Sequence, residues 1–89
     1  MGNLTVEQAA EILGAAFAPL RCVAEPWDYR SKVRFRVFDA GDQPLLRQED
    51  LTRSQVADPR RLESAIAHAR SNLAHRGYEL APWVFPAIS

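Results

Sequence analysis

The sequence has very few of the residues that build covalent or metal-based scaffolds. Its 89 residues include a single cysteine, Cys22, and two histidines. One cysteine cannot form an intramolecular disulfide, so the fold must depend on a hydrophobic core. The absence of a disulfide framework fits a reducing compartment, and we therefore expect a cytoplasmic protein.

Long apolar runs and an excess of one charge are also missing. No stretch of the sequence approaches the roughly 20 apolar residues of a membrane span. The N-terminal stretch carries Glu7 and Glu11 and no basic segment, which excludes a typical secretory signal. Eleven basic and eleven acidic residues cancel, so net charge favours neither a nucleic-acid nor a membrane partner. A hydrophobic fraction of 47% is typical of one folded domain.

The motifs of the common enzyme classes are absent as well. We find no glycine-rich phosphate loop, CxxC, HExxH or Gly-x-Ser-x-Gly. Cys22 follows Arg21 in a predicted strand, so the two side chains should point to opposite faces and the buried thiol should be inert. His68 and His75 share the predicted polar face of a helix, away from the core. We therefore expect no enzyme, no metal site and no cofactor.

What the sequence does contain is a helical pattern near each end. Thr5 and Gln8 form a capping box that opens an amphipathic helix predicted over residues 5–17. An Asp-Pro pair at 58–59 is typical of a helix start, and Gly77 of a helix end. The second helix is therefore predicted over residues 58–77.

Between the helices, the hydrophobic period changes to two. Strands are predicted near residues 20–25, 32–38 and 44–51, and "KVRFRVFD" carries the clearest alternation. "PWDYRS" and "DAGD" are predicted turns, the second with Gly41 at a positive φ, and "TRSQVAD" is predicted to be a connection. This order predicts an α+β fold for residues 1–77: a two-layer α-β-β-β-α domain, in which a three-stranded antiparallel meander carries both helices on one face.

A sheet covered on one side leaves an outer face with basic and aromatic residues. Alternation places Arg21, Arg34 and Arg36 on that face together with Phe38. A second basic feature, Arg60 and Arg61, lies in the first turn of the second helix, where backbone N–H groups could join the arginines in holding an anion. Solvated, ion-paired surface remains an alternative for both features.

The tail of residues 78–89, "YELAPWVFPAIS", is too apolar to extend freely into solvent. Its prolines exclude a helix. We expect the tail to dock, either on its own sheet or on another chain. Trp83 and Phe85 are the predicted anchors, because large aromatic side chains dominate protein interfaces.

Three motifs carry a resemblance to a known family: "FAPLRC" after the first helix, "VRFRVFD", and "DPRRLESAIAHARSNL" in the closing helix. Together they resemble the small bacterial proteins of domain-of-unknown-function family 1652 over about residues 5–76. The resemblance implies a small bacterial protein and supplies no catalytic residues. The α-β-β-β-α order is also similar to the double-stranded-RNA-binding domain, with Arg60 and Arg61 where that family contacts phosphates.

Two functions follow as predictions. The first is a non-catalytic protein-interaction module that acts as a homodimer and uses Phe38, Trp83 and Phe85. The alternative is binding of double-stranded RNA or another polyanion. The arginines assigned to that alternative are Arg21, Arg34, Arg36, Arg60 and Arg61.

Overall fold

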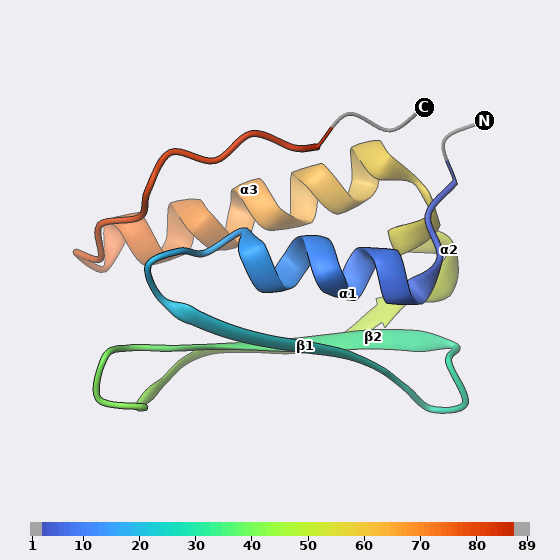
Figure 1. Cartoon of the computed structure of the whole chain (residues 1–89), viewed down its shortest axis with the longest axis horizontal. Coiled ribbons are helices and arrows are strands. Elements are labelled where there is room, and N and C mark those ends of the chain that lie inside the picture. The colour runs from blue at the N-terminus through green and yellow to red at the C-terminus, as the bar shows by residue number, and fades with distance from the viewer. Residues whose placement is uncertain (1–2, 87–89) are drawn as a thin grey trace.

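Three antiparallel strands form one layer of the structure, and every helix lies on the same side of them (Figure 1). The computed structural model describes residues 3–86. The elements are α1 (Val6–Ala15), β1 (Arg21–Trp27), β2 (Lys32–Phe38), β3 (Pro44–Thr52), α2 (Arg53–Ala57) and α3 (Pro59–His75). The sheet order β1-β2-β3 makes a meander, so the predicted α+β fold with its α-β-β-β-α layout is confirmed.

Local capping fixes where α1 and α3 begin. The Thr5 hydroxyl accepts from the Gln8 backbone N–H at 3.1 Å, and Gln8 Oε1 accepts from the Thr5 N–H at 2.9 Å. This is the predicted capping box. Asp58 caps α3, with Pro59 at its start, and Gly77 after its end has a φ of 93°.

The first hairpin is longer than the sequence predicted. Pro26 and Trp27 belong to β1 and pair with Val33 and Lys32, so the turn contains only residues 28–31. The predicted turn at "PWDYRS" is therefore present, but it begins two residues later than the start of that stretch. Proline is tolerated here because β1 is an edge strand, where its missing N–H breaks no ladder.

The second hairpin turns on an aspartate. Asp42, at φ 62°, takes the left-handed conformation that we predicted for Gly41. The Asp39 carboxylate accepts from the backbone N–H groups of Gly41 at 2.8 Å and Gln43 at 2.9 Å. These bonds confirm the predicted aspartate turn and stabilise it through the side chain, so no glycine is needed at positive φ.

The segment after the second turn contains the main departures from the predicted elements. The β2–β3 register shifts twice, between Val33 and Phe35 and between Val37 and Phe38, so β3 has an extra residue at each point. The predicted connection 52–58 contains the short helix α2, which a capping box of Thr52 and Gln55 opens. The segment does connect β3 to α3, but its helix was not predicted.

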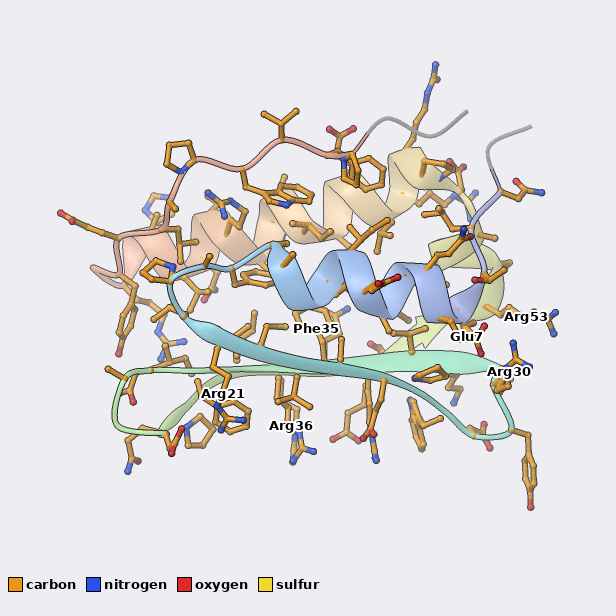
Figure 2. The ribbon with its side chains drawn as sticks, in the orientation of Figure 1. Glu7, Arg21, Arg30, Phe35, Arg36 and Arg53 are labelled. Carbon is orange, nitrogen blue, oxygen red and sulfur yellow. The ribbon has the colours of Figure 1, made fainter. Side chains whose placement is uncertain are left out.

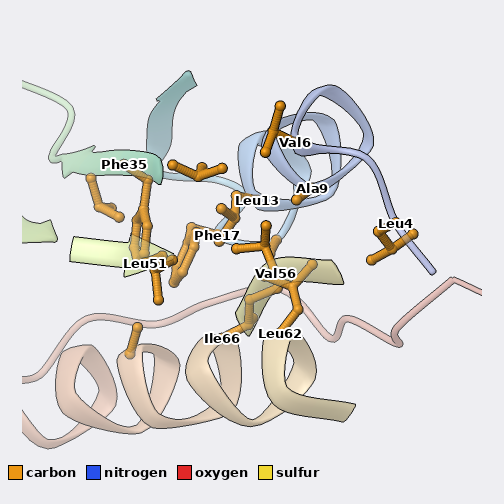
Figure 3. Packing of buried hydrophobic residues seen from close by; sticks show 14 of the residues in the cluster. Leu4, Val6, Ala9, Leu13, Phe17, Phe35, Leu51, Val56, Leu62 and Ile66 are labelled. Carbon is orange, nitrogen blue, oxygen red and sulfur yellow. The ribbon is translucent and has the colours of Figure 1, made fainter. Parts of the chain in front are cut away.

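The hydrophobic core lies between the helix-facing side of the sheet and the helices (Figure 3). Phe17, after α1, stacks on Phe35 of β2 with ring centroids 5.6 Å apart. The buried residues of the hydrophobic core are Leu4, Val6, Ala9, Leu13, Ala16, Phe17, Val33, Phe35, Val37, Leu51, Val56, Leu62, Ile66, Ala69 and Leu73. The strand alternation that predicted which side of β2 is buried is thereby confirmed.

The tail packs on its own helices. In Figure 1, residues 78–86 run back along α3 on the side away from the sheet. Tyr78, Leu80, Trp83 and Phe85 are partly buried against the core. The predicted docking on the sheet is therefore wrong for these residues: they lie in cis, on the helical layer. The last three residues of the predicted tail, 87–89, lie outside the described part of the chain.

Candidate interaction surface

The side of the sheet that faces away from the helices is the candidate site, and we call it the outer face. Figure 2 shows Arg21 and Arg36 pointing away from the helices, whereas Phe35 points between the sheet and α1. The outer face carries Arg21, Val23, Glu25, Trp27, Lys32, Arg34, Arg36, Phe38 and Arg47. Within residues 3–86, no helix and no part of the tail covers it (Figure 1).

Trp27 organises one end of the outer face. Its indole N–H donates to the Glu49 carbonyl oxygen at 2.8 Å, so a side chain from β1 reaches over β2 to β3. Lys32 Nζ lies 5.4 Å from the ring centroid, and Arg34 Cζ lies 5.5 Å from it. Each such cation–π contact contributes about 0.5–1 kcal/mol at an exposed site. The ring is therefore held in place by a hydrogen bond and two cations.

Ion pairs compensate two further arginines of the outer face. Arg34 Nη2 lies 2.7 Å from Glu25 Oε1, and Arg34 Nε donates to the same oxygen at 2.8 Å. Arg47 Nε lies 3.2 Å from Glu49 Oε1 on β3. Both pairs are partly exposed, so each contributes little to stability, but each compensates a positive charge on the outer face.

Phe38 organises the opposite end. Arg21 Cζ lies 4.4 Å from the Phe38 ring centroid, and Arg21 Nη2 lies 3.1 Å from Asp42 Oδ1 in the second turn. A shallow hollow beside Phe38 is lined by Arg36, Pro44 and Arg47 together with neighbouring β3 residues. Aromatic, arginine and proline side chains therefore meet at this end of the sheet.

Arg36 lies between the two ends. Its neighbours across the ladder are Val23 on β1 and Arg47 on β3. Among the residues that the structure describes, Arg36 has no ion-pair partner. Val23 is 37% exposed, which is high for a valine in a strand. The middle of the outer face thus presents an uncompensated cation beside an exposed apolar side chain.

The remaining arginines of the predicted anion site lie elsewhere. Arg60 and Arg61 are exposed on the first turn of α3, which belongs to the layer on the other side of the sheet. Arg61 Nε lies 3.8 Å from Asp58 Oδ2. The five predicted arginines are therefore divided: the fold brings Arg21, Arg34 and Arg36 together and keeps the α3 pair apart.

The three predicted interface aromatics are divided in the same way. Trp83 and Phe85 pack edge to face, with ring centroids 5.9 Å apart, and both are partly buried against the molecule's own helices. Only Phe38 lies on the outer face. The two tail aromatics already contact their own chain, which leaves Phe38 and Trp27 as the aromatic side chains of the uncovered sheet.

Cys22 lies on the predicted side of its strand but is only partly buried, and the histidines are exposed as the sequence predicted. Cys22 lies on β1 opposite Val37, and burial raises the pKa of its thiol to about 12. His68 and His75 are exposed on α3. Within residues 3–86, no group of three or more His, Cys, Asp or Glu side chains could hold a metal ion.

Sequence reasoning missed Trp27 and Arg47. The signal for Trp27 was present, because Val23, Glu25 and Trp27 continue the period-two pattern past Pro26. We read the proline as a strand end, although an edge strand tolerates it. Arg47 had no usable signal, because the two register shifts decide which β3 residues face outward.

No family model, no curated protein and no solved structure matches this chain. The two resemblances given under Sequence analysis therefore stay predictions. Within the described part of the chain, each helix is too short or too polar to pass through a lipid bilayer.

Proposed function

We propose that this protein is a non-catalytic interaction module that pairs with a second copy of itself through the outer face. The observation that carries the proposal is the placement of Trp27 and Phe38, with their arginines, on the one side of the sheet that the helices and tail leave open. Aromatic residues and arginine are the side chains most enriched among interface hot spots.

The contacts of the outer face favour a protein partner over a polyanion. A base-stacking surface needs open aromatic faces, but Trp27 is flanked by its own Lys32 and Arg34, and Phe38 by Arg21. A phosphate-binding surface needs uncompensated cations, but Arg21, Arg34 and Arg47 are each paired with a carboxylate. Binding of nucleic acid is therefore the less favoured function.

We propose a second copy as the partner because ion pairs compensate every outer-face cation of the described chain except Arg36. The outer face carries both signs, and the whole chain has a formal net charge of +0. A face of mixed sign can complement itself in a twofold pair, with Arg36 opposite an acidic group of the other copy. Three strands of this length cover roughly 23 by 14 Å, well below the ~800 Å² per partner of a standard interface, so we expect only a weak, transient dimer.

The compartment and source remain part of this proposal. The single cysteine supports a reducing cytoplasm. The resemblance of residues 5–76 to family 1652 supports a bacterial origin.

A matched pair of Val→Lys variants tests the proposal. Val23 is 37% exposed on the outer face, and Val84 is 86% exposed on the tail. Sedimentation velocity from about 10 to several hundred micromolar should show a monomer–dimer equilibrium for the wild type, a range that suits a weak interface. Val23→Lys should abolish the dimer, because it adds a second uncompensated cation beside Arg36. Val84→Lys should leave the dimer unchanged.

A wild type that stays monomeric, or equal behaviour of the two variants, would contradict the proposal.

Titration with duplex RNA at low salt separates the alternative. We expect no binding. Binding that weakens steeply as salt is added would instead favour the polyanion function of Arg21, Arg34, Arg36, Arg60 and Arg61.

A further inference from the structure

The tail crosses the helical layer as an extended strap between α1 and α3. The Ala81 N–H donates to the Ala18 carbonyl oxygen at 2.9 Å. Arg70 of α3 donates from Nη1 to the Ala16 carbonyl oxygen and from Nη2 to the Ala81 carbonyl oxygen at 2.7 Å. One arginine therefore joins the end of α1 to the strap, and Trp83 and Phe85 add apolar contacts.

The strap is not part of the buried core. Every buried apolar residue lies between Leu4 and Leu73, whereas the tail side chains that touch the core are only partly buried. Gly77, where the strap leaves α3, has a φ of 93° and no atom within 4 Å of the position a Cβ would occupy. The strap side chains lie at the surface of the core and not within it, so opening the strap should cost less free energy than unfolding the core.

The surface beneath the strap extends beyond it on both sides. Toward α1, a mostly apolar groove runs beside Pro86 and is lined by Leu4, Gln8, Glu11, Ile12 and Ala15. Toward α3, a second groove lies beside the strap aromatics and is lined by Glu63, Ala67 and Arg70. The strap forms one wall of each groove, through Pro86 in the first and Trp83, Val84 and Phe85 in the second, and its Ala81 carbonyl oxygen accepts from Arg70.

We propose that this surface is a docking site for an extended peptide of another protein. The peptide carries two aromatic residues, two positions apart, between prolines. Residues 78–86 occupy the site until such a peptide displaces them. The strap itself identifies the ligand chemistry, because "PWVFP" at 82–86 is the segment seated there. A proline-rich segment is already extended, so it loses little conformational entropy on docking. The site lies on the helical layer and does not depend on self-association through the outer face.

Hydrogen exchange on the wild-type chain tests whether the strap opens. The amide of Ala81 should exchange through an opening of lower free energy than the amides of β2, and this opening should be insensitive to denaturant. If Ala81 exchanges only with global unfolding, the strap does not separate and the proposal is wrong.

Peptide binding tests what the vacated surface accepts. The probe is a synthetic peptide of residues 78–86, titrated into the full-length Trp83→Ala/Phe85→Ala variant, the wild type and the Val84→Ala control. The Trp83→Ala/Phe85→Ala variant lacks the aromatic anchors of the strap, and we call it the released variant. It should bind the peptide at least about tenfold more tightly than the other two chains, because their own straps compete. Adding Arg70→Met should remove this binding, whereas Val23→Lys on the outer face should not. Equal binding by all three chains, or no binding by a folded released variant, would overturn the proposal.

Discussion

Cys22 illustrates how the side of a strand decides the chemistry of a side chain. Its neighbour Arg21 lies over Phe38 on the outer face, whereas Cys22 pairs across the ladder with the buried Val37. The guanidinium that follows the thiol in sequence therefore does not stabilise a thiolate. Burial instead raises the pKa of Cys22 from 9.0 to about 12, which keeps the thiol protonated at neutral pH.

This shift predicts a pH dependence of stability. Between pH 9 and 12 the unfolded chain releases the Cys22 proton while the folded chain keeps it, so the free energy of unfolding should fall as pH rises above about 9. Because the folded and unfolded chains differ by at most one bound proton at Cys22, this thiol can lower the free energy of unfolding by at most roughly 1.4 kcal/mol per pH unit. Urea unfolding at pH 8 and pH 10 should show a larger loss for the wild type than for Cys22→Ala. Equal losses would mean that the thiol ionises alike in both states.

Trp27 is the main outer-face residue that the sequence did not predict. Its hydrogen bond to Glu49 joins the two edge strands, and its ring contacts two cations. Alternation alone was sufficient to predict the side on which Arg34 and Arg36 lie. The contacts that neutralise Arg34 depend on Glu25, nine residues away, and so required the hairpin register.

At the scale of the elements, helix starts were predictable because their signals are local. Thr5 with Gln8, and Asp58 with Pro59, act within one turn of helix. The helix α2 has the same local box at Thr52 but only five residues, too few for an apolar period to show. The bulges in β3 reflect pairing with β2 and leave no pattern within β3 itself.

The capping box of α1 gives a prediction at this scale. Thr5→Ala removes the side-chain acceptor for the Gln8 N–H and should lower the free energy of unfolding by about 1 kcal/mol. Ser71→Ala, at an exposed position of α3, should change it by less than about 0.5 kcal/mol. Urea unfolding of both variants measures the difference. If Thr5→Ala proved as stable as Ser71→Ala, the box would not hold α1 in place.

At the scale of the whole molecule, the sequence predicted the layers but not the path of the tail. Apolarity indicates that Trp83 and Phe85 are covered, yet it does not say by which surface. That choice depends on Arg70, whose contacts with Ala16 and Ala81 join segments far apart in the chain. Because the tail lies on the helices, the outer face stays open, and the proposed self-association follows from this arrangement.

Intermolecular nuclear Overhauser effects, measured on a mixture of isotope-labelled and unlabelled chains, test the proposed pairing most directly. We expect contacts between Trp27, Val23 or Phe38 of one copy and outer-face side chains of the other. Intermolecular contacts confined to the helices or the tail, or none at concentrations where sedimentation detects a dimer, would contradict it.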